Sequence, residues 1–196
     1  MPHDAVDPIP VAFEIGLALQ SLVTRRIDVF DPVVLTCAKV TAGTTNNVIP
    51  EKAEMIGTMR ATSERARERA QEGIRRVAAN VAAAHLCEAD VTIKRGYPVT
   101  VNDAEFVDFA RAIATELLGP ENYIDRPAPI MGAEDFSYVL QRIPGCLMFL
   151  GVMPEGRREH HHVAPCHSNR MMLNEDCMAA GIAMHAAVAR RFLAQA

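Results

Sequence analysis

The stretch PVVLTCAKVTAGTTNNVIPEKAEMIGTMR, residues 32–60, decides the fold. It opens with a run rich in β-branched residues, continues through threonine, glycine and asparagine residues typical of turns, and ends in a second β-prone run. Two strands joined by so short a connection are expected to pair antiparallel. The sequence therefore predicts an antiparallel pair of strands over residues 32–40 and 53–60.

Helical patterns flank this pair of strands. Residues 7–26 begin with Asp-Pro, an N-cap followed by proline at the first helical position, and continue with apolar residues at helical spacing. Ser63 is placed to cap a second helix through about residue 85, and the many charges of its first half indicate a solvated face. Residues 91–97 then have the pattern of a third strand, and Pro98 follows where the chain would leave it.

The order helix, strand, strand, helix, strand over residues 1–97 is typical of a split βαβ, ferredoxin-like domain that lacks its opening strand. In such a sheet the first strand is normally internal, so an apolar sheet face and a row of backbone groups would be without their partner. We place the domain boundary at residues 96–98, because the pattern changes there.

Residues 98–196 have the pattern of an α/β layer. A helix is predicted from Asn102 or Asp103 to about residue 118, and a short helix over residues 134–141. The continuous apolar run at residues 146–151 has the length of a strand that is buried on both faces. Asn174 is expected to cap a last helix, with acidic residues in its first turn.

Composition excludes several classes of protein. The chain has 196 residues, 49% of them hydrophobic, and a net charge of −4 with its 20 basic residues spread along the sequence, which is no footprint for nucleic acid. No apolar run approaches the roughly 20 residues that cross a bilayer, so we expect no membrane span and a cytoplasmic location. Serine-hydrolase, nucleotide and dinucleotide motifs are absent from the sequence.

The densest group of potential metal ligands is Glu159–His167, which holds four of the seven histidines. It lies between an expected buried strand and the last helix, where ligands bind in open α/β sheets, and imidazole is a common zinc ligand. A solvated surface loop and a simple metal-binding loop both stay open as interpretations. The cluster alone cannot hold two catalytic ions, which need about six to eight donors from several elements.

Two further residues have a local and a functional interpretation. Glu134 follows a glycine turn at an expected helix start, where a carboxylate either stabilises the first turn or orders a nearby site. Asn47 lies in the turn between the two strands, where asparagine usually bonds its own backbone, and a contact with a ligand needs support from elsewhere.

Five segments in order along the chain resemble the metal-dependent amidohydrolases and peptidases of the aminoacylase, carboxypeptidase and hippurate-hydrolase family. They are MPHDAVDP at 1–8, TAGTTNNVIPEKAEMIGTMR at 41–60, GYPVTVND at 96–103, MGAEDFSYVLQRIPG at 131–145 and HSNRMMLNEDCMAAG at 167–181. The resemblance implies a lid and dimerisation domain over residues 1–97, followed by the returning βα part of a phosphorylase/hydrolase-like catalytic domain over residues 98–196.

The same resemblance implies roles for three residues. His167 matches a metal ligand, Asn47 matches the lid asparagine that contacts substrate, and Glu134 lies in a motif that orders the metal site. The implied activity is hydrolysis of N-acyl or N-aroyl amino acids with a pair of divalent ions (Mn, Zn or Ni), in a homodimer that forms through the lid. Asn169 departs from the proline common after the matching His-Ser pair.

The family's general base and its other metal ligands have no match in the chain, so we expect no catalytic residue in it and no hydrolysis by the chain alone. We hypothesise that Met1 is an internal methionine taken as a start, or the product of a split gene. The alternative is a non-catalytic module for dimerisation or regulation.

Overall fold

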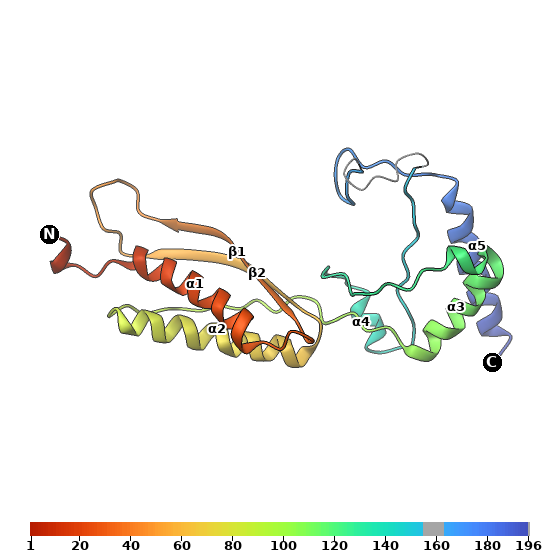
Figure 1. The fold of residues 1–196 in the computed structure, drawn as a ribbon, viewed down its shortest axis with the longest axis horizontal. Coiled ribbons are helices and arrows are strands. Elements are labelled where there is room, and N and C mark those ends of the chain that lie inside the picture. The colour runs from red at the N-terminus through yellow and green to blue at the C-terminus, as the bar shows by residue number, and fades with distance from the viewer. Residues whose placement is uncertain (155–162, 196) are drawn as a thin grey trace. The chain divides into compact units, whose positions relative to one another are not determined.

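The computed structural model describes residues 1–154 and 163–195, and the chain divides into two compact units. Unit 1 comprises residues 1–100 and 128–138, and unit 2 comprises residues 101–127 and 139–196. The described elements are helices and one small antiparallel sheet, so the predicted α/β class is confirmed (Figure 1).

Unit 1 opens with a 3-10 turn, Pro2–Asp4, and with helix α1 (Pro8–Arg26), which begins where the sequence predicts. The Asp7 carboxylate accepts a hydrogen bond from the Ile9 amide at 2.9 Å, which satisfies one of the amides that a helix start leaves unpaired. The buried face of α1 consists of Val11, Ala12, Leu19 and Leu22.

The two predicted strands are present as β1 (Val33–Ala42) and β2 (Ala53–Ala61). They pair antiparallel over their whole length, with the first residue of β1 opposite the last residue of β2, so the predicted pairing is confirmed. A bulge between Cys37 and Lys39 places one extra residue in β1.

Helix α2 (Glu64–Ala84) follows β2 directly, and the Ser63 hydroxyl accepts a hydrogen bond from the Ala66 amide at 3.0 Å, as its predicted cap requires. α1 and α2 pack against each other and against the sheet (Figure 1). The core consists of the buried Ile27, Val33, Ala66 and Ala70, with Met59 and Ala61 partly buried against them.

Two glycines of unit 1 stand where other chain segments come close. A Cβ on Gly57 would lie 2.4 Å from the Thr36 carbonyl oxygen, so the pairing of β1 and β2 requires glycine at this position. A Cβ on Gly73 would lie 2.8 Å from two methyl carbons of Leu22, so this glycine allows α1 and α2 to approach each other.

The third strand predicted over residues 91–97 is wrong, because the only sheet in the described residues consists of β1 and β2. Burial in this region still alternates as in a strand, with half-buried Cys87, Ala89, Val91 and Ile93 separated by exposed residues. A strand exists only where a neighbour shares its backbone hydrogen bonds. The segment therefore has the side-chain pattern of a strand but not the backbone hydrogen bonds to a neighbouring strand.

Unit 2 is built around helices α3 (Ala104–Leu118) and α5 (Cys177–Leu193). The Asp103 carboxylate caps α3 by accepting from the Phe106 amide at 2.8 Å, and Gly119, with φ of 88°, ends it. A 3-10 turn, Pro120–Asn122, follows, and the short helix α4 (Ser137–Leu140) replaces the longer one predicted over residues 134–141.

Aromatic and charged contacts join α3 to α5. The ring of Phe192 lies 6.1 Å from that of Phe106 and 6.5 Å from that of Phe109, measured between centroids. The Arg191 guanidinium donates to the Glu116 carboxylate. Ile113, which is 1% exposed, is the largest apolar side chain buried within α3.

The buried strand predicted at residues 146–151 is also wrong, because the structure has no strand there and Phe149 is 66% exposed. The backbone of Leu147 bonds the Asn102 side chain instead, with its amide donating to Oδ1 at 2.9 Å and its carbonyl accepting from Nδ2 at 3.2 Å. A strand buried on both faces needs neighbours on both edges, and the described residues supply none.

The last helix begins later than predicted. Asn174 accepts a hydrogen bond from the Asp176 amide at 3.1 Å and so caps a turn, while α5 itself starts at Cys177. No helix in the described part of the chain is both long enough and apolar enough to cross a membrane.

Candidate functional site

His167, the predicted metal ligand, is exposed in a tight turn of unit 2. The Ser168 amide donates to the Pro165 carbonyl at 3.0 Å, and His167 itself has φ of 72°. A side chain other than glycine in this left-handed region costs on the order of 1 kcal/mol. The turn therefore exposes the imidazole of His167 to solvent, at a cost in backbone conformational energy.

The other histidines of the segment 159–167 lie outside the described residues, because the structure does not describe residues 155–162. The interpretation of that segment as a ligand cluster stays a prediction for these positions, and only His167 has a described conformation.

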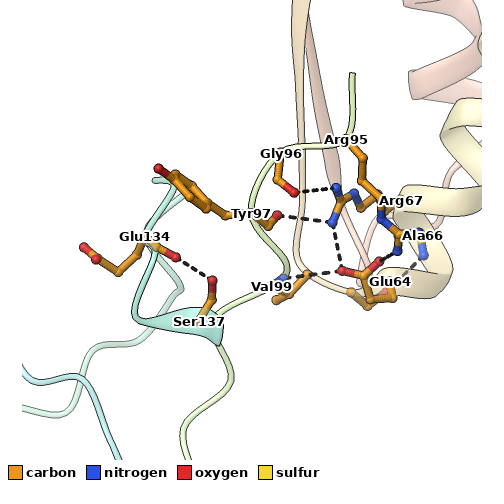
Figure 2. Close-up of polar contacts among 10 residues, drawn as sticks. Glu64, Ala66, Arg67, Arg95, Gly96, Tyr97, Val99, Glu134 and Ser137 are labelled. Carbon is orange, nitrogen blue, oxygen red and sulfur yellow. Dashed lines mark hydrogen bonds and ion pairs between the residues drawn. The ribbon is translucent and has the colours of Figure 1, made fainter. Parts of the chain in front are cut away.

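Glu134 is half-buried in unit 1, just before α4. Its backbone carbonyl accepts hydrogen bonds from the amide and the hydroxyl of Ser137, which is fully buried (Figure 2). The Arg60 guanidinium donates to the Met131 carbonyl at 2.9 Å and holds the segment on β2. The carboxylate makes a single weak contact within the described residues, with the Phe136 amide at 3.4 Å, so it keeps lone pairs for another donor.

Asn47 is exposed in the turn between β1 and β2, and its Oδ1 accepts a hydrogen bond from the Thr45 hydroxyl at 3.2 Å. This contact joins two side chains within the turn, and it differs from the bond to its own backbone that asparagine usually makes there. Asn47 and Glu134 belong to unit 1, whereas His167 belongs to unit 2.

The described residues bring together no group of three or more histidine, cysteine, aspartate or glutamate side chains that could hold a metal ion. His167 has the right chemistry for one donor to a divalent ion, an imidazole. The Glu134 carboxylate keeps free acceptor positions and is suited to order such a donor rather than to bind the ion. A single donor forms no metal shell by itself in unit 1 or unit 2.

A polar cluster that the sequence did not reveal fixes the end of unit 1. We call it the Arg67 cluster, and it joins the first turn of α2 to the segment 95–99 (Figure 2). The Arg67 guanidinium donates to Glu64 Oε1 at 3.0 Å and to the carbonyls of Gly96 and Tyr97, each at 3.2 Å. Arg67 is only 7% exposed, so these bonds are shielded from water.

Glu64 is the acceptor at the centre of the Arg67 cluster. Its second oxygen accepts from Arg95 at 2.8 Å, and its first also accepts from the Val99 amide at 3.4 Å. Burial raises the pKa of the Glu64 carboxyl, but the hydrogen bond and charge of Arg67, with smaller contributions from Arg95 and Val99, outweigh it and lower the pKa below its usual value.

The prediction of a solvated charged face on α2 is wrong for Arg67, since this side chain is buried. A signal was present in the sequence. Arg67 lies three residues before Ala70 and next to Ala66, which puts it at the margin of the alanine stripe that α2 buries.

The chain matches the family described as peptidase family M20/M25/M40 over residues 9–191. It belongs to that family. The M20/M25/M40 chain is 32% identical over 192 residues to thermostable carboxypeptidase 2 of Saccharolobus solfataricus, covering 97% of this chain and 47% of the relative. It is 35% identical over 197 residues to IAA-amino acid hydrolase ILR1-like 4 of Arabidopsis thaliana, covering 98% of this chain and 44% of the relative.

Among solved structures, the M20/M25/M40 chain is similar to a dinuclear metal-binding peptidase of the M20 family from Bacillus subtilis. The TM-score is 0.75 at 29% identity, over 94% of this chain and 46% of that one. The chain thus spans about half the length of the proteins it matches.

Proposed function

We propose that this chain supplies the lid, residues 1–97, and the returning part of the catalytic domain, residues 98–196, of a binuclear-metal amidohydrolase. The substrates we propose are N-acyl or N-aroyl amino acids, as for a hippurate hydrolase, and we place the enzyme in the cytoplasm. The observation that carries this proposal is the family match over residues 9–191. Relatives named as a carboxypeptidase and as an IAA-amino acid hydrolase support hydrolysis of an amide bond.

In this proposal three residues have separate tasks. His167 donates its imidazole nitrogen to a metal ion, which its exposed position in the turn allows. Glu134 orients a ligand of the metal site through its carboxylate, which makes one long hydrogen bond in the described residues. Asn47 binds the substrate, and for this it exchanges the bond from the Thr45 hydroxyl for one from the ligand.

Divalent ions such as Mn, Zn or Ni, when bound, supply a Lewis acid and lower the pKa of a water molecule. The chain contributes one proposed metal ligand, and a two-ion site needs several more. We therefore propose that the chain alone does not hydrolyse amides, and that polypeptide beyond its 196 residues supplies the general base.

The experiment compares the chain with a chimera that joins it to the portion of thermostable carboxypeptidase 2 that it does not span. Hydrolysis of hippurate and of N-acetyl amino acids is measured with added Mn, Zn or Ni. We expect no turnover by the chain, metal-dependent turnover by the chimera, and loss of that turnover in the chimera with His167→Ala. An Arg170→Ala chimera, changed at an exposed neighbour, controls for damage to the turn.

Two results would contradict the proposal. Turnover by the 196-residue chain alone would show that the general base and the remaining ligands are within it. Full activity of the His167→Ala chimera would remove His167 from the site.

We further propose that the protein is a homodimer that pairs through unit 1. Both strands of the small sheet pair only with each other in the described residues, so each has an edge whose backbone groups are open to a partner. Light scattering on the purified chain tests this, since a monomer at all concentrations would contradict it.

A further inference from the structure

Ser168 joins two consecutive turns of unit 2, and His167 lies in the first of them. The Ser168 amide donates to the Pro165 carbonyl at 3.0 Å and closes the first turn, and the Met171 amide donates to the Ser168 carbonyl at 3.1 Å and closes the second. In each turn the carbonyl of the first residue bonds the amide of the fourth. Ser168 is the last residue of one turn and the first residue of the other, so its backbone is fixed on both sides.

The side chain of Ser168 adds a third hydrogen bond to this junction. Its hydroxyl oxygen accepts from the Arg170 amide at 3.1 Å, which is the local turn that serine forms with a backbone amide two residues on. Ser168 is half-buried, whereas its neighbours on both sides are exposed, namely Cys166, His167, Asn169 and Arg170. The serine therefore anchors the loop and leaves the residues beside it open to solvent.

The backbone conformation of His167 depends on such an anchor. With φ of 72°, His167 occupies the third position of the first turn, where a positive φ usually requires glycine or asparagine. For histidine, the cost of this conformation is of the same order as the net contribution of one hydrogen bond to stability. The single bond that closes the first turn thus only balances the cost. The two bonds that Ser168 makes to the residues after it stabilise the observed conformation.

We propose that Ser168 is a positioning residue for the metal ligand His167. Because it locks the turn, it sets the backbone of His167, and with it the direction of the imidazole, before an ion binds. A donor that is already ordered loses less entropy on binding, so the ion is held more tightly. The assignment of His167 to a metal rests on the proposed function, whereas the effect of Ser168 on the backbone of His167 does not.

The first experiment measures the conformation of residue 167 in the 196-residue chain without metal. Ser168→Ala removes the hydroxyl and leaves every backbone group in place. We expect it to shift the equilibrium at residue 167 about tenfold away from the left-handed conformation, because the bond from the Arg170 amide is lost. Ser168→Thr keeps a hydroxyl and should stay close to the native chain. By NMR, the Cα chemical shift of residue 167 and the coupling between its amide and Cα protons report φ.

The matched control is Asn174→Ala. Asn174 is half-buried in the same unit, and its Oδ1 accepts from the Asp176 amide, also two residues on and also at 3.1 Å. If Ser168 has only a structural role, both alanine variants should lower the Tm by a similar amount and leave φ of residue 167 unchanged. If Ser168 positions His167, only Ser168→Ala should change this angle.

The second experiment measures binding of Mn²⁺ to the chimera that tests the proposed function, by competition with a fluorescent chelator. We expect Ser168→Ala to raise the dissociation constant of one ion about tenfold. Ser168→Thr and Asn174→Ala should each change it by less than about threefold. Retained affinity in Ser168→Thr would assign the effect to the hydroxyl that the two residues share.

Two results would overturn the inference. An unchanged φ of residue 167 in Ser168→Ala would show that the histidine keeps its conformation without the hydroxyl. A changed φ with unchanged affinity for Mn²⁺ would show that this conformation does not matter to the ion. A native chimera that binds no Mn²⁺ would contradict the proposed function instead, and the NMR measurement would then decide by itself whether Ser168 positions His167.

Discussion

Unit 1 and unit 2 bury their helices to different extents. In unit 1, the long helices α1 and α2 each have a buried stripe, and a core cluster joins them to the sheet. In unit 2, α3 has buried residues, but none of the described residues of α5 is buried, although Met178 and Ile182 are apolar. Two regions of one chain therefore differ in how much of the apolar surface of their helices is buried within the described residues.

The largest expected effect comes from the largest fully buried side chain described in unit 2. Ile113→Ala should lower the free energy of unfolding of this unit by about 2 to 4 kcal/mol, since the isoleucine is 1% exposed and its removal leaves a cavity. Met178→Ala, at a residue that is 50% exposed, should have little effect. Urea unfolding, followed by hydrogen exchange of each unit, measures the loss of stability in both variants. Equal losses would show that burial does not distinguish the two side chains.

A glycine comparison tests the sheet of unit 1. Gly57→Ala should cost about 1 to 3 kcal/mol, because its Cβ would lie 2.4 Å from a backbone oxygen that cannot easily move. At Gly151 in unit 2, no atom of the described residues lies within 4 Å of the new carbon, so Gly151→Ala should be close to neutral. Thermal unfolding of both variants gives the difference, and a neutral Gly57→Ala would show that β1 and β2 separate without cost.

The Arg67 cluster predicts an effect of similar or smaller size. Arg67→Met should cost about 1 to 3 kcal/mol, because Glu64 and two backbone carbonyls lose their common donor. The control is Arg65→Met, since Arg65 has a side chain that is 78% exposed and should contribute about 0 to 1 kcal/mol. Chemical unfolding of unit 1 distinguishes them, and equal costs would mean that burial of Arg67 adds nothing.

The smallest expected effect depends on pH. Hydrogen bonds from Ser63 and Arg65 lower the pKa of Asp31, against a smaller opposing effect of desolvation. A carboxyl with a lowered pKa stabilises the fold above its unfolded pKa and ceases to do so as the pH falls through its folded pKa. We expect Asp31→Asn to lower the Tm of unit 1 at pH 7 and to differ less from the native chain near pH 3. A difference in Tm that stays the same at both pH values would exclude a contribution from ionisation of Asp31.

The sequence predicted the elements that local signals determine. Asp7, Ser63 and Asp103 are all helix caps in the structure, because a cap depends on one side chain and the amides beside it. The antiparallel pairing of β1 and β2 was predictable for a similar reason, since both strands and their connection lie within one short stretch.

The two wrong strands, at residues 91–97 and 146–151, depend on partners rather than on local signals. Alternating or continuous apolar residues show that a segment is suited to a sheet, but a ladder needs a second backbone at the right distance. The candidate site also combines local and non-local information. His167, Asn47 and Glu134 were named from the family resemblance, and their roles stay predictions. Burial of Arg67 depends on the carbonyls of Gly96 and Tyr97, which approach it only in the folded unit.

At position 167, the residue that suits the backbone conformation best differs from the residue that binds a metal ion. Asparagine adopts a φ of 72° at lower cost than histidine, so His167→Asn should relieve strain and raise the melting temperature slightly. The same substitution would remove the only imidazole that we assign to metal. Selection of variants for thermal stability alone would therefore favour replacement of His167. A screen of this protein must measure metal binding as well as stability.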